Sequence, residues 1–238
     1  MDIKYWTKFY QKHKTNTNPS LFARFVYENY LSLQAAPSLL ELGCGNGRDA
    51  FYFAQNGVSV VAIDQIEEEI AYLSAQKKAN TSFVCGDFTQ LDDLKAQFNC
   101  IYSRFTLHSI SLKEQKRLFK ALPHLLCPNG ILAIEARGYK NSLYKKGEPV
   151  SLQEDAFIYD GHYRRFVNFE LLCDELKDSF ELVFAKEQLG FAPFNNQDDY
   201  FFRIIALASN KRERERERER EKQRATGSKI MLSGCLNL

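Results

Sequence analysis

The sequence has 238 residues, of which 45% are hydrophobic, 13% aromatic and 26% charged. This length allows one α/β domain with a full core. Of the 32 Lys and Arg residues and the 30 Asp and Glu residues, 9 and 5 lie from Lys211 onward, so residues 1–210 carry 23 basic and 25 acidic side chains. A slightly acidic folded part excludes the basic footprint of a nucleic-acid-binding protein.

Six cysteines are spread along the chain without a CxxC pair, and several lie in apolar, strand-like runs. This is the pattern of buried free thiols in a reducing compartment, not of disulfides or a zinc site. No apolar run reaches the ~18 residues of a membrane helix, and the first residues do not resemble a signal peptide. We therefore predict a cytoplasmic protein with no membrane segment and no bound metal. The cysteines are Cys44, Cys85, Cys100, Cys127, Cys173 and Cys235.

Residues 1–38 precede the first predicted strand. Four aromatic side chains occur there at helical spacing: Tyr5, Trp6, Phe9 and Tyr10. Ser20 stands where the N-cap of a following helix is expected. The aromatic cluster either packs on the core or forms a lid that excludes water from a site.

The chain is organised around an apolar run that enters a glycine-rich loop. The run is 39–42, glycines occupy every second position from Gly43 to Gly47, and a helical pattern starts at Ala50. This order predicts a strand, a turn and a helix at the start of a parallel sheet. Glycine allows positive φ and lets a ligand approach the backbone closely. A dinucleotide site needs Gly-x-Gly-x-x-Gly, but counted from Gly43 the third glycine position is occupied by Arg48.

Further strands alternate with helices. We expect strands at 58–64, 81–85, 98–103, 131–137, 180–185 and 200–208, with helices at about 67–79 and 113–126. Gly130 is expected to open the fifth strand. Asp64 ends the second strand, where an acid can accept hydrogen bonds from both ribose hydroxyls of a nucleoside. NAD and SAM share that requirement, so Asp64 indicates a nucleoside site without choosing between these cofactors.

The series Glu41-x-Gly43-x-Gly45-x-Gly47 resembles motif I of the class I S-adenosylmethionine (SAM)-dependent methyltransferases. The N-terminal Tyr-Trp…Phe-Tyr pattern resembles the segment that covers the cofactor in tellurite-resistance-type and thiopurine-type members. The resemblance implies a Rossmann-like, doubly wound sheet of seven strands, mostly parallel with an antiparallel last strand and with helices on both faces. It also implies SAM as the cofactor.

Two later segments carry the same resemblance. Residues 86–88, Gly-Asp-Phe, resemble the family element after the third strand, and Leu126-x-Pro128-x-Gly130 resembles the segment before the fifth strand. The resemblance places Glu41 near the amino-acid end of SAM, Asp87 at the adenine amino group and Phe88 on the adenine ring. The cofactor-binding residues that it implies are Glu41, Gly43, Gly45, Gly47, Asp64, Gln65, Asp87, Phe88, Ser103 and Arg104.

The segment after the fifth strand, residues 138–168, is dense in Arg, His and Tyr. It follows the carboxyl end of a strand and is placed to close over a methyl acceptor. Arg binds carboxylate or phosphate through paired hydrogen bonds. We therefore expect a small anionic acceptor, such as a sugar or metabolite that carries phosphate or carboxylate. The predicted substrate residues are Trp6, Arg137, Tyr139, Tyr163, Arg164 and Arg165.

The pattern of residues 162–166 predicts a strand with Tyr163 and Arg165 on one face and His162 and Arg164 on the other, so not all of them reach one site. His108 and His162 are the predicted catalytic residues, as general bases for an acceptor that loses a proton. A structural or substrate-orienting His108 is equally open, and alignment of the reactants alone is a further alternative.

The predicted organisation is an N-terminal lid segment (1–38), a SAM-binding domain (39–210) with its insertion at 138–168, and a charged tail (211–238). The tail holds five Arg-Glu repeats, which cannot bury a core and predict a solvated helix or disorder. We expect a monomer or homodimer that acts on a small molecule. The alternatives are an NAD(P)-dependent oxidoreductase, which Arg48 disfavours, and a non-catalytic SAM-binding regulator.

Overall fold

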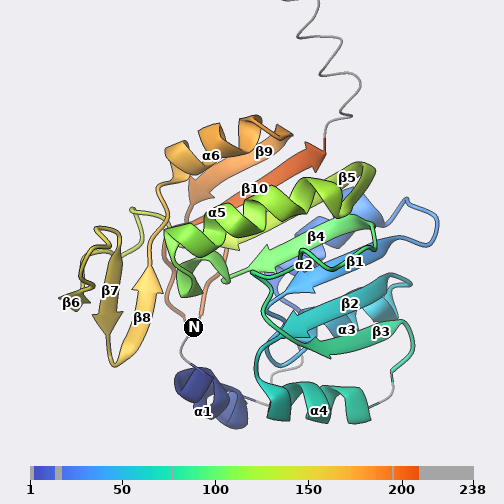
Figure 1. The fold of residues 1–238 in the computed structure, drawn as a ribbon, viewed down its shortest axis with the longest axis horizontal. Coiled ribbons are helices and arrows are strands. Elements are labelled where there is room, and N and C mark those ends of the chain that lie inside the picture. The colour runs from blue at the N-terminus through green and yellow to red at the C-terminus, as the bar shows by residue number, and fades with distance from the viewer. Residues whose placement is uncertain (1–2, 14–17, 77, 195, 209–238) are drawn as a thin grey trace, which may run out of the picture. The chain divides into compact units, whose positions relative to one another are not determined.

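A seven-stranded sheet organises the part of the chain that the computed structural model describes, residues 3–13, 18–76, 78–194 and 196–208 (Figure 1). The predicted tail, residues 211–238, lies outside the described residues. The strands of the sheet are β1 (Ser38–Leu42), β2 (Ser59–Asp64), β3 (Thr81–Cys85), β4 (Phe98–Arg104), β5 (Leu126–Ala136), β9 (Phe180–Gln188) and β10 (Phe201–Ala208).

The strand order is β3-β2-β1-β4-β5-β10-β9. Strand β10 runs antiparallel to both of its neighbours, and β1 to β5 pair in parallel. This confirms the predicted doubly wound sheet with an antiparallel last strand. The order reverses between β1 and β4, so the carboxyl ends of these two strands flank the crevice in which such sheets bind ligands.

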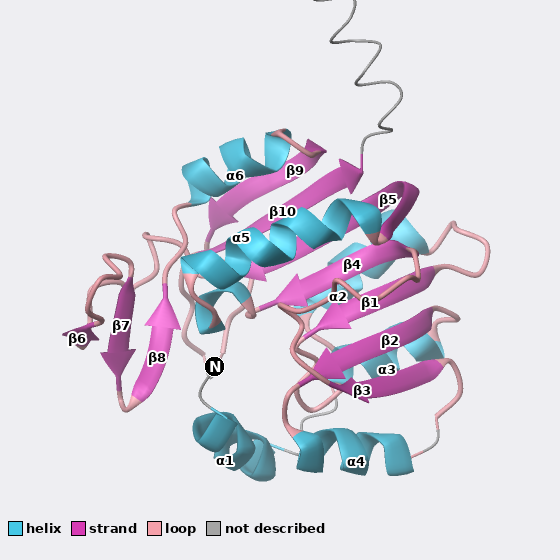
Figure 2. Ribbon diagram, viewed as in Figure 1, coloured by secondary structure: helices cyan, strands magenta, loops and turns pink. Residues whose placement is uncertain are grey.

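Helices cover both faces of the sheet, as predicted (Figure 2). Residues of α2, α3 and α4 share one core with the sheet, and residues of α5 and α6 share the other. Within β1, Leu39 faces the first core, whereas Leu40 and Leu42 face the second, because side chains alternate along a strand. The helices are α1 (Ile3–His13), α2 (Leu21–Val26), α3 (Arg48–Gln55), α4 (Glu67–Ala75), α5 (Leu112–Ala121) and α6 (Phe169–Lys177).

Ser20 caps α2, as predicted: its hydroxyl accepts a hydrogen bond from the Ala23 N–H at 2.9 Å. The same hydroxyl donates to Asp49 at 2.8 Å, and the Tyr102 hydroxyl donates to that carboxylate at 2.9 Å. The side chains of Ser20, Asp49 and Tyr102 are all buried. They tie the start of α2 to α3 and β4 directly beside the glycine loop.

Two predicted boundaries near β5 are wrong. Helix α5 ends at Ala121, and a 3₁₀ turn, Leu122–His124, follows it instead of further helix. Strand β5 begins at Leu126, so Gly130 lies inside the strand instead of opening it. The pairing register of β4 with β5 shifts at this point, and a Cβ on Gly130 would lie 2.9 Å from the Cys127 carbonyl oxygen. Gly130 thus permits close backbone packing at an irregularity in the strand.

The segment between β5 and α6 forms a separate three-stranded sheet of β6 (Glu148–Pro149), β7 (Ala156–Tyr159) and β8 (His162–Arg165). This small sheet and α1 lie at the end of the large sheet where β1, β2 and β4 terminate (Figure 1). The predicted strand at 162–166 is therefore confirmed, and the insertion stands where the sheet presents its ligand edge.

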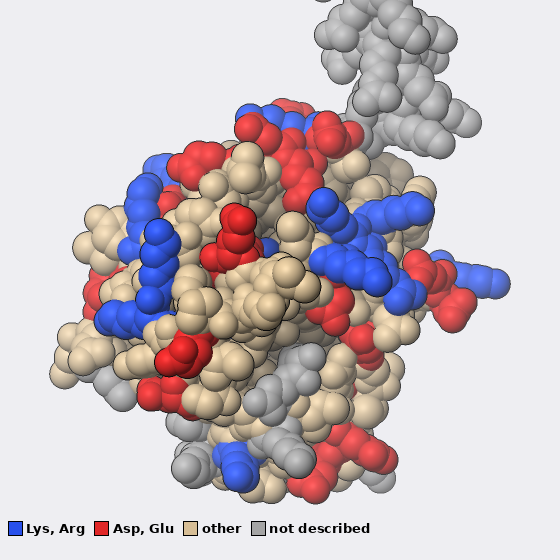
Figure 3. Space-filling model, turned by 60° about the vertical axis from the view of Figure 1, so that its left-hand side comes forward, with Lys and Arg blue, Asp and Glu red and all other residues tan. Residues whose placement is uncertain are grey.

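On the face drawn in Figure 3, Lys and Arg side chains gather in two places, each bordered by Asp and Glu. None of the described helices is both long and apolar enough to span a bilayer.

Candidate functional site

The loop after β1 is built for close approach to its backbone. Gly43, Gly45 and Gly47 all have positive φ, at 70°, 53° and 71°. A Cβ on Gly43 would lie 2.6 Å from the Thr106 side chain, and a Cβ on Gly45 would lie 2.8 Å from the Tyr10 ring. Only glycine meets both the backbone angle and the available space at these positions.

Glu41 is a buried carboxylate at the end of β1, with 4% of the residue exposed. Its Oε2 has no hydrogen-bond partner among the described residues. Burial, followed by the charge of Asp49, raises the pKa of Glu41 well above its usual range, although Arg48 opposes the shift. A carboxylate with an unused oxygen beside a glycine loop can bind a cationic group.

Asp64 joins the tip of β2 to the glycine loop. Its carboxylate accepts hydrogen bonds from the Gly45 N–H at 2.9 Å and the Ile66 N–H at 3.1 Å. Burial raises the pKa of Asp64 despite these donors. The second strand therefore ends in an acid that touches the loop, as a nucleoside site requires.

The acid after β3 lies in a turn that it stabilises itself. Asp87 accepts hydrogen bonds from the Thr89 N–H and hydroxyl at 2.9 and 2.8 Å and from the Gln90 amide at 2.8 Å. Burial raises the pKa of Asp87, but hydrogen bonds from Gln90, Thr89 and Gln65 outweigh burial and lower the pKa overall. Phe88 is 1% exposed and lies beside Gly43, with a ring carbon 3.6 Å from the position of a Cβ there. The structure thus places Phe88 in the core under the loop.

The end of β4 carries one neutralised cation. Arg104 donates to Glu135 at 2.8 Å, and the same buried carboxylate accepts from Arg203 at 2.6 Å. Ser103 is buried and hydrogen-bonds to the Thr106 hydroxyl. Both predicted residues therefore border the crevice, but the charge of Arg104 is compensated within the protein.

His108 lies in a 3₁₀ turn, Leu107–Ser109, and is 5% exposed. Its Nδ1 has no hydrogen-bond partner among the described residues. Burial lowers the pKa of His108 well below its ordinary value, and the nearby charges of Arg137, His162, Arg164 and Arg104 lower it further. The imidazole is therefore neutral at physiological pH and surrounded by cationic side chains.

Arg137, the residue directly after β5, is a cation of this group without an ion-pair partner among the described residues. Its guanidinium donates to the Asn141 side-chain oxygen Oδ1 at 3.2 Å and lies 4.7 Å from the centre of the Phe201 ring. Among the described residues no carboxylate forms an ion pair with it. Burial and the charge of Arg164 lower the pKa of Arg137 to about 10. A half-buried guanidinium without a carboxylate partner is suited to receive an anion.

The faces of β8 separate the other predicted substrate residues. The charges of His162 and Arg164 add to the effect of burial in lowering the pKa of His108, whereas burial raises the pKa of Tyr163 and the charge of Arg165 opposes that rise. Arg165 is 2% exposed and donates to Asp155, Gln115 and the carbonyls of Leu107 and Ile110. These partners hold the insertion against the turn that carries His108, so the structure does not bring Arg165 together with Arg137 and Arg164.

Two predicted tyrosines also make contacts within the insertion. The Tyr163 hydroxyl donates to Gln153 at 2.7 Å. Tyr139 stacks on Tyr144, with ring centroids 4.4 Å apart and planes 4° apart. Neither contact places these side chains at His108.

Trp6 and its neighbours on α1 reach the site from outside the sheet. Trp6 meets the His162 ring edge-on at 5.1 Å, and Tyr5 stacks on that ring at 3.8 Å. At the other end of the helix, Tyr10 packs on Gly45, and burial, followed by the charge of Asp64, raises the pKa of Tyr10. Tyr5 and Tyr10 were not predicted as site residues, although their aromatic spacing on one helix was visible in the sequence.

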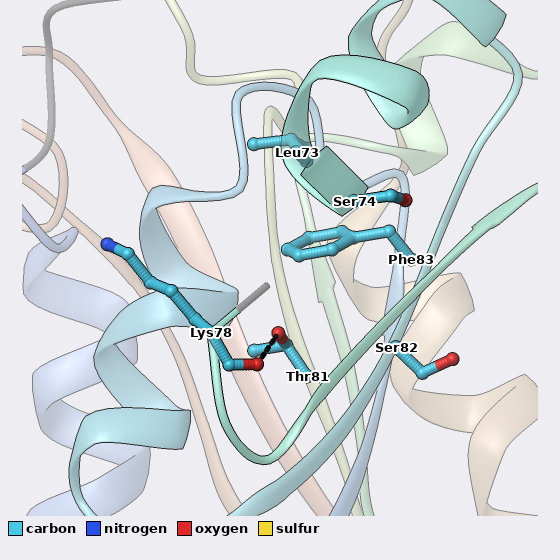
Figure 4. A pocket seen from close by; sticks show the side chains of 6 residues that line it. All are labelled: Leu73, Ser74, Lys78, Thr81, Ser82 and Phe83. Carbon is cyan, nitrogen blue, oxygen red and sulfur yellow. Dashed lines mark hydrogen bonds between the residues drawn. The ribbon is translucent and has the colours of Figure 1, made fainter. Parts of the chain in front are cut away.

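A separate hollow lies between α4 and β3. It has a volume of about 230 Å³ and is lined at the end of α4 and along β3 by Leu73, Ser74, Lys78, Thr81, Ser82 and Phe83 (Figure 4). Thr81 opens β3, so this hollow reaches the edge of the sheet opposite the carboxyl ends of the parallel strands. In the part of the chain that the structure describes, no group of His, Cys, Asp and Glu side chains is arranged to hold a metal.

Comparison with known proteins matches residues 39–130 to the family described as "Methyltransferase domain". An uncharacterized methyltransferase of Schizosaccharomyces pombe is 30% identical over 91 residues, which cover 37% of this chain and 63% of the relative. Phosphoethanolamine N-methyltransferase 3 of Arabidopsis thaliana is 30% identical over 173 residues, which cover 68% of this chain and 34% of the relative. The chain thus spans less than two thirds of the length of these relatives.

A solved structure of a SAM-dependent methyltransferase from Methanosarcina mazei superposes with a TM-score of 0.66, at 22% identity, over 77% of this chain and 97% of the other. At this identity the likeness concerns the fold. Residues 39–130 thus match the methyltransferase-domain family, and the described sheet has the fold of this solved SAM-dependent methyltransferase. The matched segment contains the glycine loop, Asp64 and residues 86–88.

Proposed function

We propose that this protein transfers a methyl group from SAM to a small acceptor that carries a phosphate or carboxylate. The observation that carries the acceptor assignment is Arg137, a half-buried cation at the ligand edge of the sheet with no carboxylate partner among the described residues. The cofactor assignment is supported by the open glycine loop and by the unused oxygen of Glu41.

The residues present fit SAM. The amino group of the cofactor's amino-acid part is a cation, and Glu41 offers a buried carboxylate oxygen without a partner. The glycine loop has no side chains that would keep the ligand from the backbone. Asp64 stands at the tip of β2, where ribose hydroxyls would be bound, and Asp87 with Gln65 would face the adenine. When bound, SAM supplies a methyl group on a positively charged sulfur, which is already activated for displacement.

The acceptor would be held by Arg137 and Arg164. Burial weakens competition from water and strengthens the attraction between a guanidinium and an anion. Arg164 donates to the Tyr159 carbonyl at 2.8 Å through one guanidinium nitrogen, which leaves its remaining N–H groups for a ligand. One relative is named for phosphoethanolamine, a small molecule with a phosphate group, which also supports an anionic acceptor.

His108 is the proposed proton acceptor. Because its imidazole is neutral at physiological pH and its Nδ1 has no hydrogen-bond partner among the described residues, it can take a proton from an acceptor hydroxyl or ammonium. Because the surrounding cations disfavour the protonated imidazole, they favour release of the proton before the next turnover. His162 is the second candidate and lies close enough to influence His108.

The test is a panel of phosphorylated amines, phosphorylated sugars and carboxylate metabolites, each paired with its neutral analogue, with formation of S-adenosylhomocysteine (SAH) as the readout. We expect turnover of anionic acceptors only. Arg137→Ala should raise KM for the best acceptor by about tenfold or more, the loss of one hydrogen bond to a charged group. The matched control is Arg117→Ala, which removes an exposed guanidinium on α5. Equal turnover of a neutral analogue, or equal effects of both variants, would contradict the acceptor assignment.

A further inference from the structure

The imidazole of His162 is held by a helix from the other end of the chain. The Tyr5 ring stacks on it with centroids 3.8 Å apart and planes 16° apart, and Trp6 meets it at 88°. His162 is 3% exposed, although it directly follows the turn of the β7–β8 hairpin, where Asp160 and Gly161 both have positive φ. A side chain at such a turn is buried here because α1 covers it.

The same imidazole is one of the basic side chains that lie near His108. His162 and Arg164 lie on the face of β8 that acts on His108, and Tyr5 is near enough to influence Arg137. Stacking covers a face of the imidazole, whereas both nitrogens lie on the ring edge. A ring held in one plane presents those nitrogens in one direction.

Helix α1 depends on these contacts for its position. A helix of 11 residues is marginal by itself in water. Two aromatic attachments seat it: Tyr5 and Trp6 on His162, and Tyr10 on Gly45 of the glycine loop. Both attachments use one aromatic surface of the helix, so the acceptor side and the cofactor side of the site are touched by the same element.

We propose that Tyr5 is a positioning residue for His162: it fixes the plane of the imidazole so that His162, with Arg137, binds the anionic group of the acceptor. The acceptor site is therefore complete only when α1 is seated. This inference rests on the proposed function, because it assumes that an anion binds at Arg137. It assigns α1 a part in acceptor binding that is separate from any contact with the cofactor.

The first experiment is NMR spectroscopy of the full chain with labelled histidine, which gives four imidazole signals. The His162 signal is assigned by its loss in His162→Asn. A ring stacked on a phenol is shifted upfield, and we expect that shift in the wild type and in Tyr5→Phe. Tyr5→Leu should abolish it. Phe9→Leu, which removes another aromatic ring one turn along the same helix, is the matched control and should retain the shift.

The second experiment titrates the same samples with inorganic phosphate as the anion probe. We expect Tyr5→Leu to weaken phosphate binding by about tenfold, the loss of one hydrogen bond to a charged group, with Tyr5→Phe and Phe9→Leu close to the wild type. SAH affinity, measured in parallel, should be the same in all four proteins, which shows that Tyr5→Leu is folded.

Each result has one meaning. An upfield His162 signal or wild-type phosphate affinity in Tyr5→Leu overturns the positioning role. A wild type that binds SAH but gives no response to phosphate overturns the anionic acceptor and the inference with it. A wild type that fails to bind SAH overturns the proposed function at its cofactor.

Discussion

Replacing Glu41 by Gln should make the protein more stable and a poorer binder of SAH. Glu41 is 4% exposed and its Oε2 has no partner among the described residues. An unsatisfied buried charged group costs roughly 1–3 kcal/mol or more. Glutamine keeps the shape and removes the charge, so we expect the free energy of unfolding to rise by about 2 kcal/mol at pH 8.

The predicted gain in stability should depend on pH in a direction that can be checked. Burial raises the pKa of Glu41 above its unfolded value of about 4.3. The folded state therefore binds the proton more tightly than the unfolded state, and stability falls as pH rises from about 4.3 through the folded pKa, by at most about 1.4 kcal/mol per pH unit. The advantage of glutamine should be small near pH 4.5 and larger at pH 8.

Urea denaturation of the full chain at pH 5 and pH 8 measures the stability, and calorimetric titration measures SAH affinity. We expect SAH to bind at least about tenfold more weakly to Glu41→Gln, because one charge-assisted hydrogen bond is lost. A variant that is less stable at pH 8 and binds SAH as tightly as the wild type would show that Glu41 has a structural role and no ligand.

Three further perturbations test the site. The wild type should lose stability as pH falls below about 6.5, by up to about 1.4 kcal/mol per pH unit, because His108 takes up a proton in the unfolded chain but not when it is buried. His108→Gln should remove this loss. An equal change in urea midpoint between pH 7.5 and pH 5.5 in both proteins would contradict this. Gly45→Ala should destabilise the protein by about 1 kcal/mol more than Gly57→Ala, because both alanines meet a positive φ but only the Cβ on Gly45 has a neighbour within 4 Å; equal thermal shifts would remove the steric argument. Arg203→Met should cost about 3–5 kcal/mol in urea, because it takes one of two cations from the buried Glu135; a loss below about 1 kcal/mol would mean that Arg104 alone neutralises this carboxylate.

The fold was predictable because its signals are local. The alternation of apolar strands with helices, the glycine series and the acid at Asp64 each depend on neighbouring residues only. The boundary at Gly130 was not predictable, because its position depends on the Phe98 carbonyl of the adjacent strand, 3.0 Å from a Cβ at that glycine. A proline and a glycine close together indicate a turn in sequence but do not show that the turn lies within a paired strand.

The different contacts of the three predicted arginines could be seen only in the structure. In sequence nothing distinguishes Arg137, Arg164 and Arg165. In the structure, Arg165 donates hydrogen bonds to Gln115, Asp155 and two backbone carbonyls. Arg137, in contrast, has no ion-pair partner among the described residues. The alternation within β8 predicted the split between its two faces but not which face meets His108. That choice is set by the packing of the insertion against the turn after β4, a contact between segments more than 50 residues apart.

The most direct test of the cofactor is calorimetric titration of the full chain with SAH and, separately, with NADH, in the wild type and in Asp64→Asn. We expect one SAH site per chain in the wild type, a loss of about tenfold or more in affinity for Asp64→Asn, and no heat from NADH. Binding of NADH in place of SAH would contradict the assignment of the glycine loop to SAM.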